Sequence, residues 1–116
     1  MTYDPFRDRE KQATLEALLA DPRVSKSEKK RALTERYLGA LMQIVGIRNS
    51  KGVLVGYREG FTKGKLEVLA RDYAKKALKD LRPSAMTRAL RQGLEENPAL
   101  GRAFIAGWPK EEKDDA

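Results

Sequence analysis

Cysteine and histidine are both missing from this chain of 116 residues. Without cysteine there is neither a disulfide framework nor thiolate chemistry. Without histidine the chain lacks the most common general base and the most common metal ligand. The acidic residues are scattered among basic ones rather than gathered as a hard-metal site requires. We therefore expect a protein that is not an enzyme, with no catalytic residues, no metal site and no other cofactor.

Long apolar runs are absent as well. No stretch approaches the ~20 apolar residues that a membrane-spanning helix needs. The N-terminal sequence MTYDPFRDRE is charged and lacks the apolar segment of a signal peptide. These two absences predict a cytoplasmic protein with no membrane partner.

The balance of charge is basic, with 24 lysine and arginine residues against 17 acidic ones and a net charge of +7. Such an excess favours an anionic partner, which can be a nucleic acid, DNA or RNA, or an acidic protein surface. The alternative is that the charges only keep the surface of an ordinary helical protein solvated. Net charge alone does not distinguish an anionic partner from such a surface.

Helix signals begin close to the N-terminus. Asp4 and Pro5 predict the start of a first helix, which Pro22 ends. Ser25 and Glu28 have the spacing of a capping box, so a second helix should start near residue 26. Its first turns carry Lys26, Lys29 and Lys30, where cations oppose the helix dipole and are candidates for contact with an anion.

The second half of the chain continues the helical pattern. A third helix should run from about 51 to 81, where Pro83 breaks it and Ser84 can cap a fourth. Asn97, followed by proline, predicts a last short helix.

The whole pattern predicts a single all-α domain over residues 1–109, a small bundle of four to five helices. The acidic sequence KEEKDDA at 110–116 reads as a disordered tail.

A glycine stands at every fourth position from 52 to 64. Residues four apart share one ridge of a helix, so these glycines would form a groove that lets another helix approach closely. The large residues of the second helix, or the same helix of a second copy in a homodimer, would fill that groove. The predicted partner or helix-packing face comprises Gly52, Gly56, Tyr57, Gly60, Phe61 and Gly64.

The run GYREGFTKGK within this repeat resembles the glycine-repeat helices of the flagellar export regulator family. That resemblance implies a helix and association with another protein, and nothing about chemistry.

A β-hairpin at about 44–57 is the alternative structure for the same stretch. Val53 and Val55 are β-branched and alternate, as Val45 and Ile47 do, and residues 49–52 between them, Asn-Ser-Lys-Gly, have good turn chemistry. The sequence leaves helix and hairpin both open here.

A second pattern, at residues 70–95, reads as helix, short turn, helix. The segment 83–90 resembles the start of the recognition helix in helix-turn-helix repressors of the lactose-repressor kind. That resemblance implies that the second helix enters the major groove of duplex DNA. Asp80 departs from it, because the motif usually turns on glycine there. The candidate nucleic-acid-binding residues are Lys75, Lys79, Arg82, Ser84, Thr87, Arg88 and Arg91.

Two functions follow as hypotheses. The first is a small basic non-enzymatic protein that binds nucleic acid, with a helix-turn-helix-like unit that reads duplex DNA. The alternative is a helical adaptor or inhibitor that binds a protein partner, or itself, through the glycine-repeat face. Phage- or plasmid-encoded regulators and ribonucleoprotein subunits are proteins of this kind.

Overall fold

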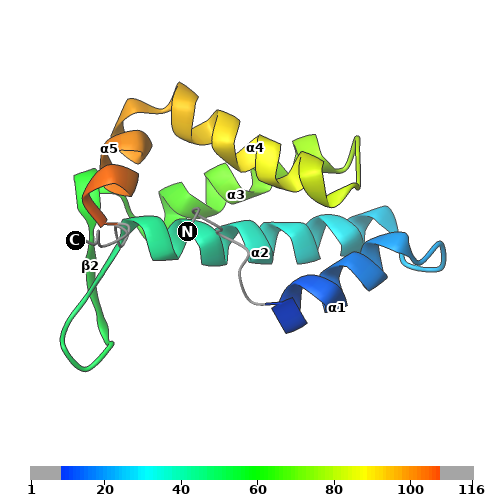
Figure 1. The fold of residues 1–116 in the computed structure, drawn as a ribbon, viewed down its shortest axis with the longest axis horizontal. Helices are drawn as coiled ribbons and strands as arrows, with labels where there is room; N and C mark the ends of the chain where they lie inside the picture. The colour runs from blue at the N-terminus through cyan, green and yellow to red at the C-terminus, as the bar shows by residue number, and fades with distance from the viewer. Residues whose placement is uncertain (1–8, 108–116) are drawn as a thin grey trace, which may run out of the picture.

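A computed structural model describes residues 9–107, which form five α-helices, a two-stranded antiparallel hairpin and one short 3-10 turn (Figure 1). The mostly helical fold with one hairpin confirms the predicted fold class. The predicted start at Asp4 and the tail at 110–116 lie outside the described residues. In chain order the elements are α1 (Arg9–Ala20), α2 (Lys26–Val45), β1 (Gly46–Arg48), β2 (Leu54–Tyr57), η1 (Arg58–Gly60), α3 (Lys63–Ala77), α4 (Pro83–Glu96) and α5 (Pro98–Gly107).

Side-chain caps fix several helix starts where the sequence places them. The Ser25 hydroxyl accepts a hydrogen bond from the Glu28 amide at 3.1 Å and donates one to its carboxylate at 3.2 Å. The Asn97 side chain accepts from the Leu100 amide at 3.2 Å at the start of α5. These contacts satisfy amide groups that the first turn of a helix leaves unpaired.

The start of α4 differs from the prediction by two residues. Arg82, not Ser84, occupies the N-cap position, and its side chain makes no capping hydrogen bond. The proline takes the first turn instead, because its fixed φ and missing amide suit that position. Ser84 is exposed inside the helix.

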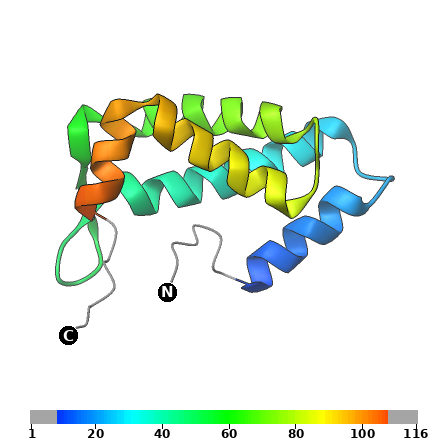
Figure 2. The ribbon, with the colours of Figure 1, turned by 45° about the horizontal axis from the view of Figure 1, so that its top comes forward.

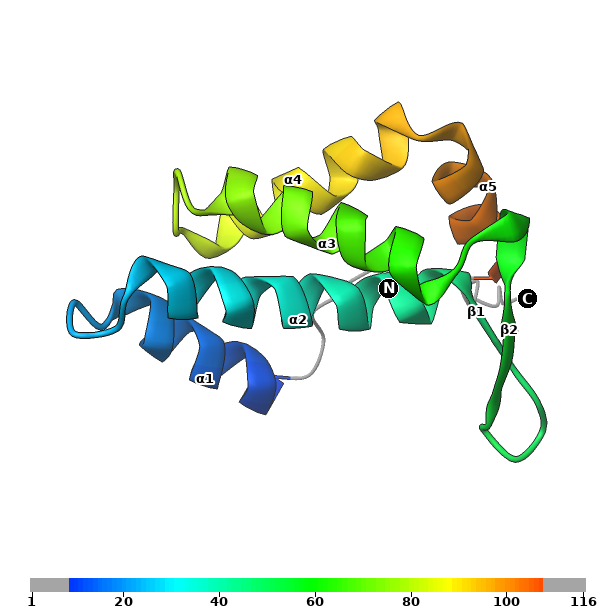
Figure 3. The ribbon, with the colours of Figure 1, turned by 180° about the vertical axis from the view of Figure 1, so that it is seen from behind.

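The 20-residue helix α2 is the centre of the bundle. Helix α3 runs antiparallel along it, α4 folds back over α3, and α5 lies across the end of α2 near the hairpin (Figures 1 and 3). The large side chains that repeat at helical spacing along α2 are all completely buried: Leu33, Tyr37, Leu41, Ile44 and Val45. These side chains form the centre of the core.

The predicted helix through the glycine repeat is wrong, and residues 46–57 form the hairpin. Gly52 and Gly60 have φ values of 79° and 71°, in the left-handed region that helices exclude, and Gly56 lies in β2. Of the four glycines only Gly64 lies in an α-helix, as the second residue of α3, and Gly60 ends the 3-10 turn η1. A helix with four interior glycines would cost about 4 kcal/mol relative to alanine, whereas turns use glycine at positive φ without strain.

Alanines on α3 provide the close approach that the glycines were expected to provide. Ala70, Ala74 and Ala77 are buried in the core shared with α2. Their small side chains let the large residues of α2 pack closely against the α3 backbone.

Two tyrosines join α3 and α4 to α2. The Tyr37 hydroxyl donates a hydrogen bond to the Met86 carbonyl of α4 at 2.8 Å. The Tyr37 and Tyr73 rings meet edge to face, with centroids 5.7 Å apart and planes at 76°. The Tyr73 ring fills the space above Gly93, where a Cβ atom would overlap it. Through these contacts α4 is held to α2 at Met86 and to α3 at Gly93.

Candidate nucleic-acid interface

The antiparallel packing of α2 and α3 brings three basic segments to one end of the bundle. The connection 21–25 that leads into α2 and the connection 78–82 that leads into α4 lie at the same end in each view (Figures 1, 2 and 3). We call this region the basic end. It comprises Lys26, Lys29 and Lys30 of α2, Lys75 of α3, Lys79 and Arg82 of the connection, and Arg88 of α4.

The predicted contact residues around α4 are accessible. Lys75, Lys79, Ser84, Arg88 and Arg91 are exposed. Arg82 is exposed as well, and Thr87 is half-buried.

Positions 84, 88 and 91 are separated by four and three residues, so their side chains share one face of α4. The opposite face carries the buried Met86 and Leu90. The amphipathic pattern of α4 therefore presents the predicted residues together and away from the core.

Arg82 is partly neutralised by its neighbour Asp80. The Arg82 Nε atom donates to the Asp80 carboxylate at 2.9 Å, Nη2 also contacts it, and the backbone amide of Arg82 donates to Oδ1 at 3.2 Å. These hydrogen bonds lower the pKa of Asp80 to about 2, with smaller contributions from the charges of Arg82 and Arg88. Asp80 therefore stays ionised and fixes the position of Arg82.

Other acids at this end hold cations in the same way. Asp21 pairs with Arg23 at 3.1 Å, and Asp72 pairs with Lys76 at 3.4 Å. The hydrogen bond from Arg23 lowers the pKa of Asp21, and the charge of Lys29 adds to the effect.

Most cations of the basic end remain without an acid in the described part of the chain. Lys29, Lys30, Lys75, Lys79 and Arg88 make no ion pair within 4 Å among residues 9–107. The positive ends of the α2 and α4 dipoles lie here beside the negative ends of the α1 and α3 dipoles, so the dipoles offset one another and the charged side chains set the sign of the charge. Cations therefore outnumber acids at this end, where Lys75 and Lys79 are exposed and Lys29 and Lys30 are half-buried.

The predicted glycine face does not exist as one surface. Gly52 lies in the hairpin turn, Gly56 and Tyr57 in β2, Gly60 in η1 and Gly64 in α3. Tyr57 and Phe61 are half-buried and pack against the core. The glycine groove therefore supports neither an adaptor nor a dimer.

An open groove between α1 and α2 was not predicted. Helix α1 contacts α2 near the 21–25 connection and diverges from it toward its own start (Figure 2). The groove has a volume of about 510 Å³. The sequence marks the groove by Gly39, a glycine inside the predicted second helix. In the structure Gly39 is exposed, and a Cβ atom there would meet nothing within 4 Å. The lining residues are Glu10, Lys11, Thr14, Leu15, Leu18, Ala32, Glu35, Arg36 and Gly39.

Within residues 9–107 no helix has the length and apolar composition to cross a membrane. The chain matches no known family model, and neither the curated proteins nor the solved structures give a match.

Proposed function

We propose that this protein binds nucleic acid through phosphate contacts made by the basic end and that it does so without catalysing a reaction. The observation that carries the proposal is the convergence of lysines from α2, α3 and the α3–α4 connection, which the sequence separates by about 50 residues. Lysines that lack an acid partner can neutralise phosphates and release their counterions, which supplies most of the free energy of non-specific binding.

The positions of the acidic residues along the chain are consistent with a phosphate-binding role for the described part. Several of them lie outside the described region, so residues 9–107 are more basic than the net charge of +7 suggests. The acids outside that region are Asp4, Asp8, Glu111, Glu112, Asp114 and Asp115.

The exposed face of α4 is the part of the proposal that concerns sequence reading. Ser84, Arg88 and Arg91 can donate hydrogen bonds to base edges, and arginine pairs with guanine in the major groove. Because α4 folds back along α3 (Figure 3), only this outer face is available to a duplex. We propose that phosphate contacts by the lysines orient the molecule and that Arg88 and Arg91 add contacts in the groove.

The test compares two double variants of equal charge. Lys75→Ala/Lys79→Ala removes two cations from the basic end, and Lys63→Ala/Arg71→Ala removes two exposed cations of α3 outside it. Affinity for labelled duplex DNA and single-stranded RNA is measured by fluorescence anisotropy. We expect the first variant to bind at least tenfold more weakly, because each lost phosphate contact costs about one decade at moderate salt, while the control stays close to the wild type.

Base reading has a separate readout. Arg88→Ala/Arg91→Ala should reduce the preference among duplex sequences as well as the affinity. If Lys75→Ala/Lys79→Ala and the control Lys63→Ala/Arg71→Ala bind equally well, the basic end is not the interface. If the arginine variant binds every duplex as the wild type does, α4 does not read DNA.

The α1–α2 groove supports the adaptor or inhibitor function as a second candidate. Its floor of Leu15, Leu18 and Ala32 suits the apolar face of a partner helix. Gly39→Leu would place an apolar side chain in the groove, and its Cβ atom would meet nothing within 4 Å. An apolar fluorescent dye that binds the wild type and not Gly39→Leu would show that the groove accepts an apolar ligand; equal dye binding would exclude the groove as its site.

A further inference from the structure

The hairpin projects away from the bundle and its tip is held rigidly. The Asn49 side chain accepts hydrogen bonds from the amides of Lys51 at 2.9 Å and Val53 at 3.0 Å. The backbone amide of Asn49 donates a hydrogen bond to the Val53 carbonyl at 3.0 Å, and Arg48 Nη1 donates one to the Gly52 carbonyl at 2.9 Å. Gly52 takes the positive φ that this turn requires. These hydrogen bonds fix the shape of the tip, and the hairpin of residues 46–57, which we call the arm, projects from the bundle (Figures 1 and 3).

The arm is basic and partly apolar, with no opposing charge of its own. Residues 46–57, which form the hairpin, contain one arginine, one lysine and no acid. Arg48 and Lys51 are exposed near the tip. Val53 and Val55 are 55% and 62% exposed. Val55 has no partner in β1, because the register skips it between Leu54 and Gly56, and such bulges redirect a side chain.

These features fit a nucleic acid better than a second copy of the chain. A two-stranded ribbon fits the major groove, where cations meet phosphates and apolar side chains contact thymine methyl groups. A second hairpin would bring like charges together. Charge complementarity therefore selects an anionic partner.

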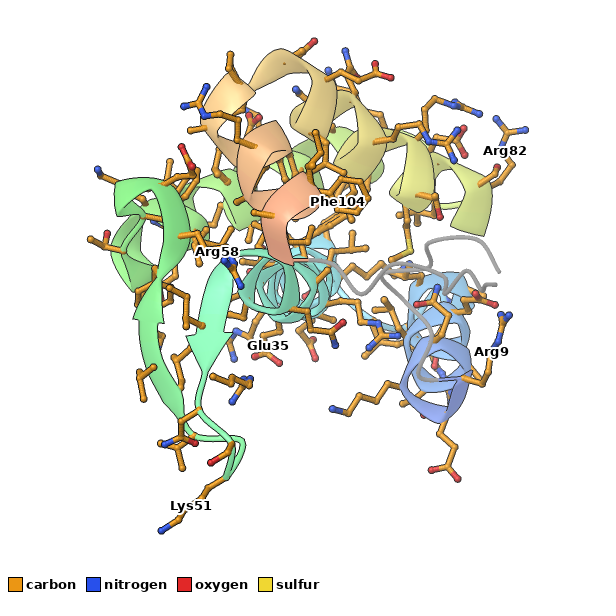
Figure 4. All side chains as sticks on the ribbon, turned by 60° about the vertical axis from the view of Figure 1, so that its left-hand side comes forward. Arg9, Glu35, Lys51, Arg58, Arg82 and Phe104 are labelled. Atoms are coloured by element: carbon orange, nitrogen blue, oxygen red, sulfur yellow. The ribbon has the colours of Figure 1, made fainter. Side chains whose placement is uncertain are left out.

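The hairpin and the basic end lie far apart. Lys51 and Arg82 point to opposite corners of the molecule (Figure 4), whose longest extent is 46 Å. Resting on the proposed function of the basic end, we infer that the hairpin is a second, separate nucleic-acid contact, so that one molecule holds two duplex segments at once.

The experiment measures bridging and single binding side by side. A biotinylated duplex is fixed on beads, and capture of a second, fluorescent duplex by the protein is recorded. Anisotropy with one labelled duplex measures single binding. For Arg48→Ala/Lys51→Ala we expect capture to fall at least about tenfold. Single binding should fall by less than about threefold, because the basic end carries more cations.

Further variants separate the causes. Lys51→Glu leaves the hydrogen bond from Arg48 to the Gly52 carbonyl in place. It should also lower capture at least about tenfold, which would show that the loss does not come from a loosened tip. Lys75→Ala/Lys79→Ala should lower both readouts, and Lys63→Ala/Arg71→Ala neither. Circular dichroism confirms that each variant is folded.

Four results would overturn the inference. Unchanged capture by the hairpin variants would mean that bridging does not use the hairpin. Single binding without capture by the wild type would mean that the molecule has one contact only. A dimer in the absence of DNA that the hairpin substitutions dissociate would assign the arm to a second copy. Absence of all binding would refute the proposed function itself and the inference with it, and the anisotropy measurement with one labelled duplex would show this directly.

Discussion

Alanine at Gly93 should destabilise the protein, whereas alanine at Gly39 should stabilise it. Both glycines lie in helix interiors, Gly39 in α2 and Gly93 in α4. In each helix the replacement gains about 1 kcal/mol from the lower conformational entropy of alanine in the unfolded chain. The two sites differ only in what the new Cβ atom meets.

At Gly39 the Cβ atom meets nothing within 4 Å, so the gain of about 1 kcal/mol should appear in full. At Gly93 it would overlap the hydroxyl, Cζ and Cε1 atoms of Tyr73. Tyr73 is only 2% exposed and its ring packs edge to face on Tyr37, so it has no room to withdraw. Overpacking of this kind costs about 1–3 kcal/mol, and for a rigid ring we expect the upper end, a net loss of about 2 kcal/mol.

Urea denaturation followed by circular dichroism measures both effects. The midpoint should rise for Gly39→Ala and fall for Gly93→Ala, with an unchanged slope, since neither variant alters the surface exposed on unfolding. Tyr73→Leu supplies the control, because it removes the ring, and Gly93→Ala should cost much less in that background. Equal midpoints for the two alanine variants would refute the packing of Tyr73 against α4.

Three further predictions concern single side chains. Tyr37→Phe should lower the free energy of unfolding by about 1 kcal/mol, because the Tyr37 hydroxyl donates a hydrogen bond to the Met86 carbonyl. In the same denaturation assay Tyr73→Phe should be neutral or stabilising, because the buried Tyr73 hydroxyl has no partner among the described residues. Ser25→Ala should cost about 1 kcal/mol in thermal unfolding through loss of the α2 cap. An NMR titration should give Asp80 a pKa of about 2, and Arg82→Ala should raise that pKa toward 3.8. Because the folded pKa is the lower one, the stabilisation from this pair should be complete above about pH 4 and disappear as the pH falls through about 2.

Local signals carried the correct part of the fold prediction. Ser25 and Asn97 cap their helices as predicted, because a cap depends on residues within one turn. Along α2, Leu33, Tyr37 and Leu41 recur every four residues, a spacing that is typical of one face of a helix, and all three are buried.

The glycine repeat misled the interpretation of residues 51–65 because spacing alone does not report backbone conformation. Gly52 and Gly60 are required at positive φ, so their separation reflects the positions of two turns. The informative residues were Asn49, whose side chain organises the tip, and the β-branched Val53 and Val55.

The candidate site was only half predictable for a similar reason. The exposed residues of α4 could be inferred from its amphipathic pattern. That the lysines at the start of α2 lie at the same end depends on antiparallel packing against α3, and no local pattern encodes it. The Tyr73–Gly93 contact between α3 and α4 is likewise a product of tertiary structure.

The salt dependence of binding tests the central claim most directly. Anisotropy titrations with labelled duplex DNA between ~50 and ~200 mM salt give the slope of log affinity against log salt concentration. We expect tight binding at the lower salt, a steep fall toward the higher one, and a slope reduced by about two in Lys75→Ala/Lys79→Ala, one unit for each lost phosphate contact. Absence of binding at ~50 mM salt, or the same slope in that variant as in the wild type, would contradict a phosphate-binding role for the basic end.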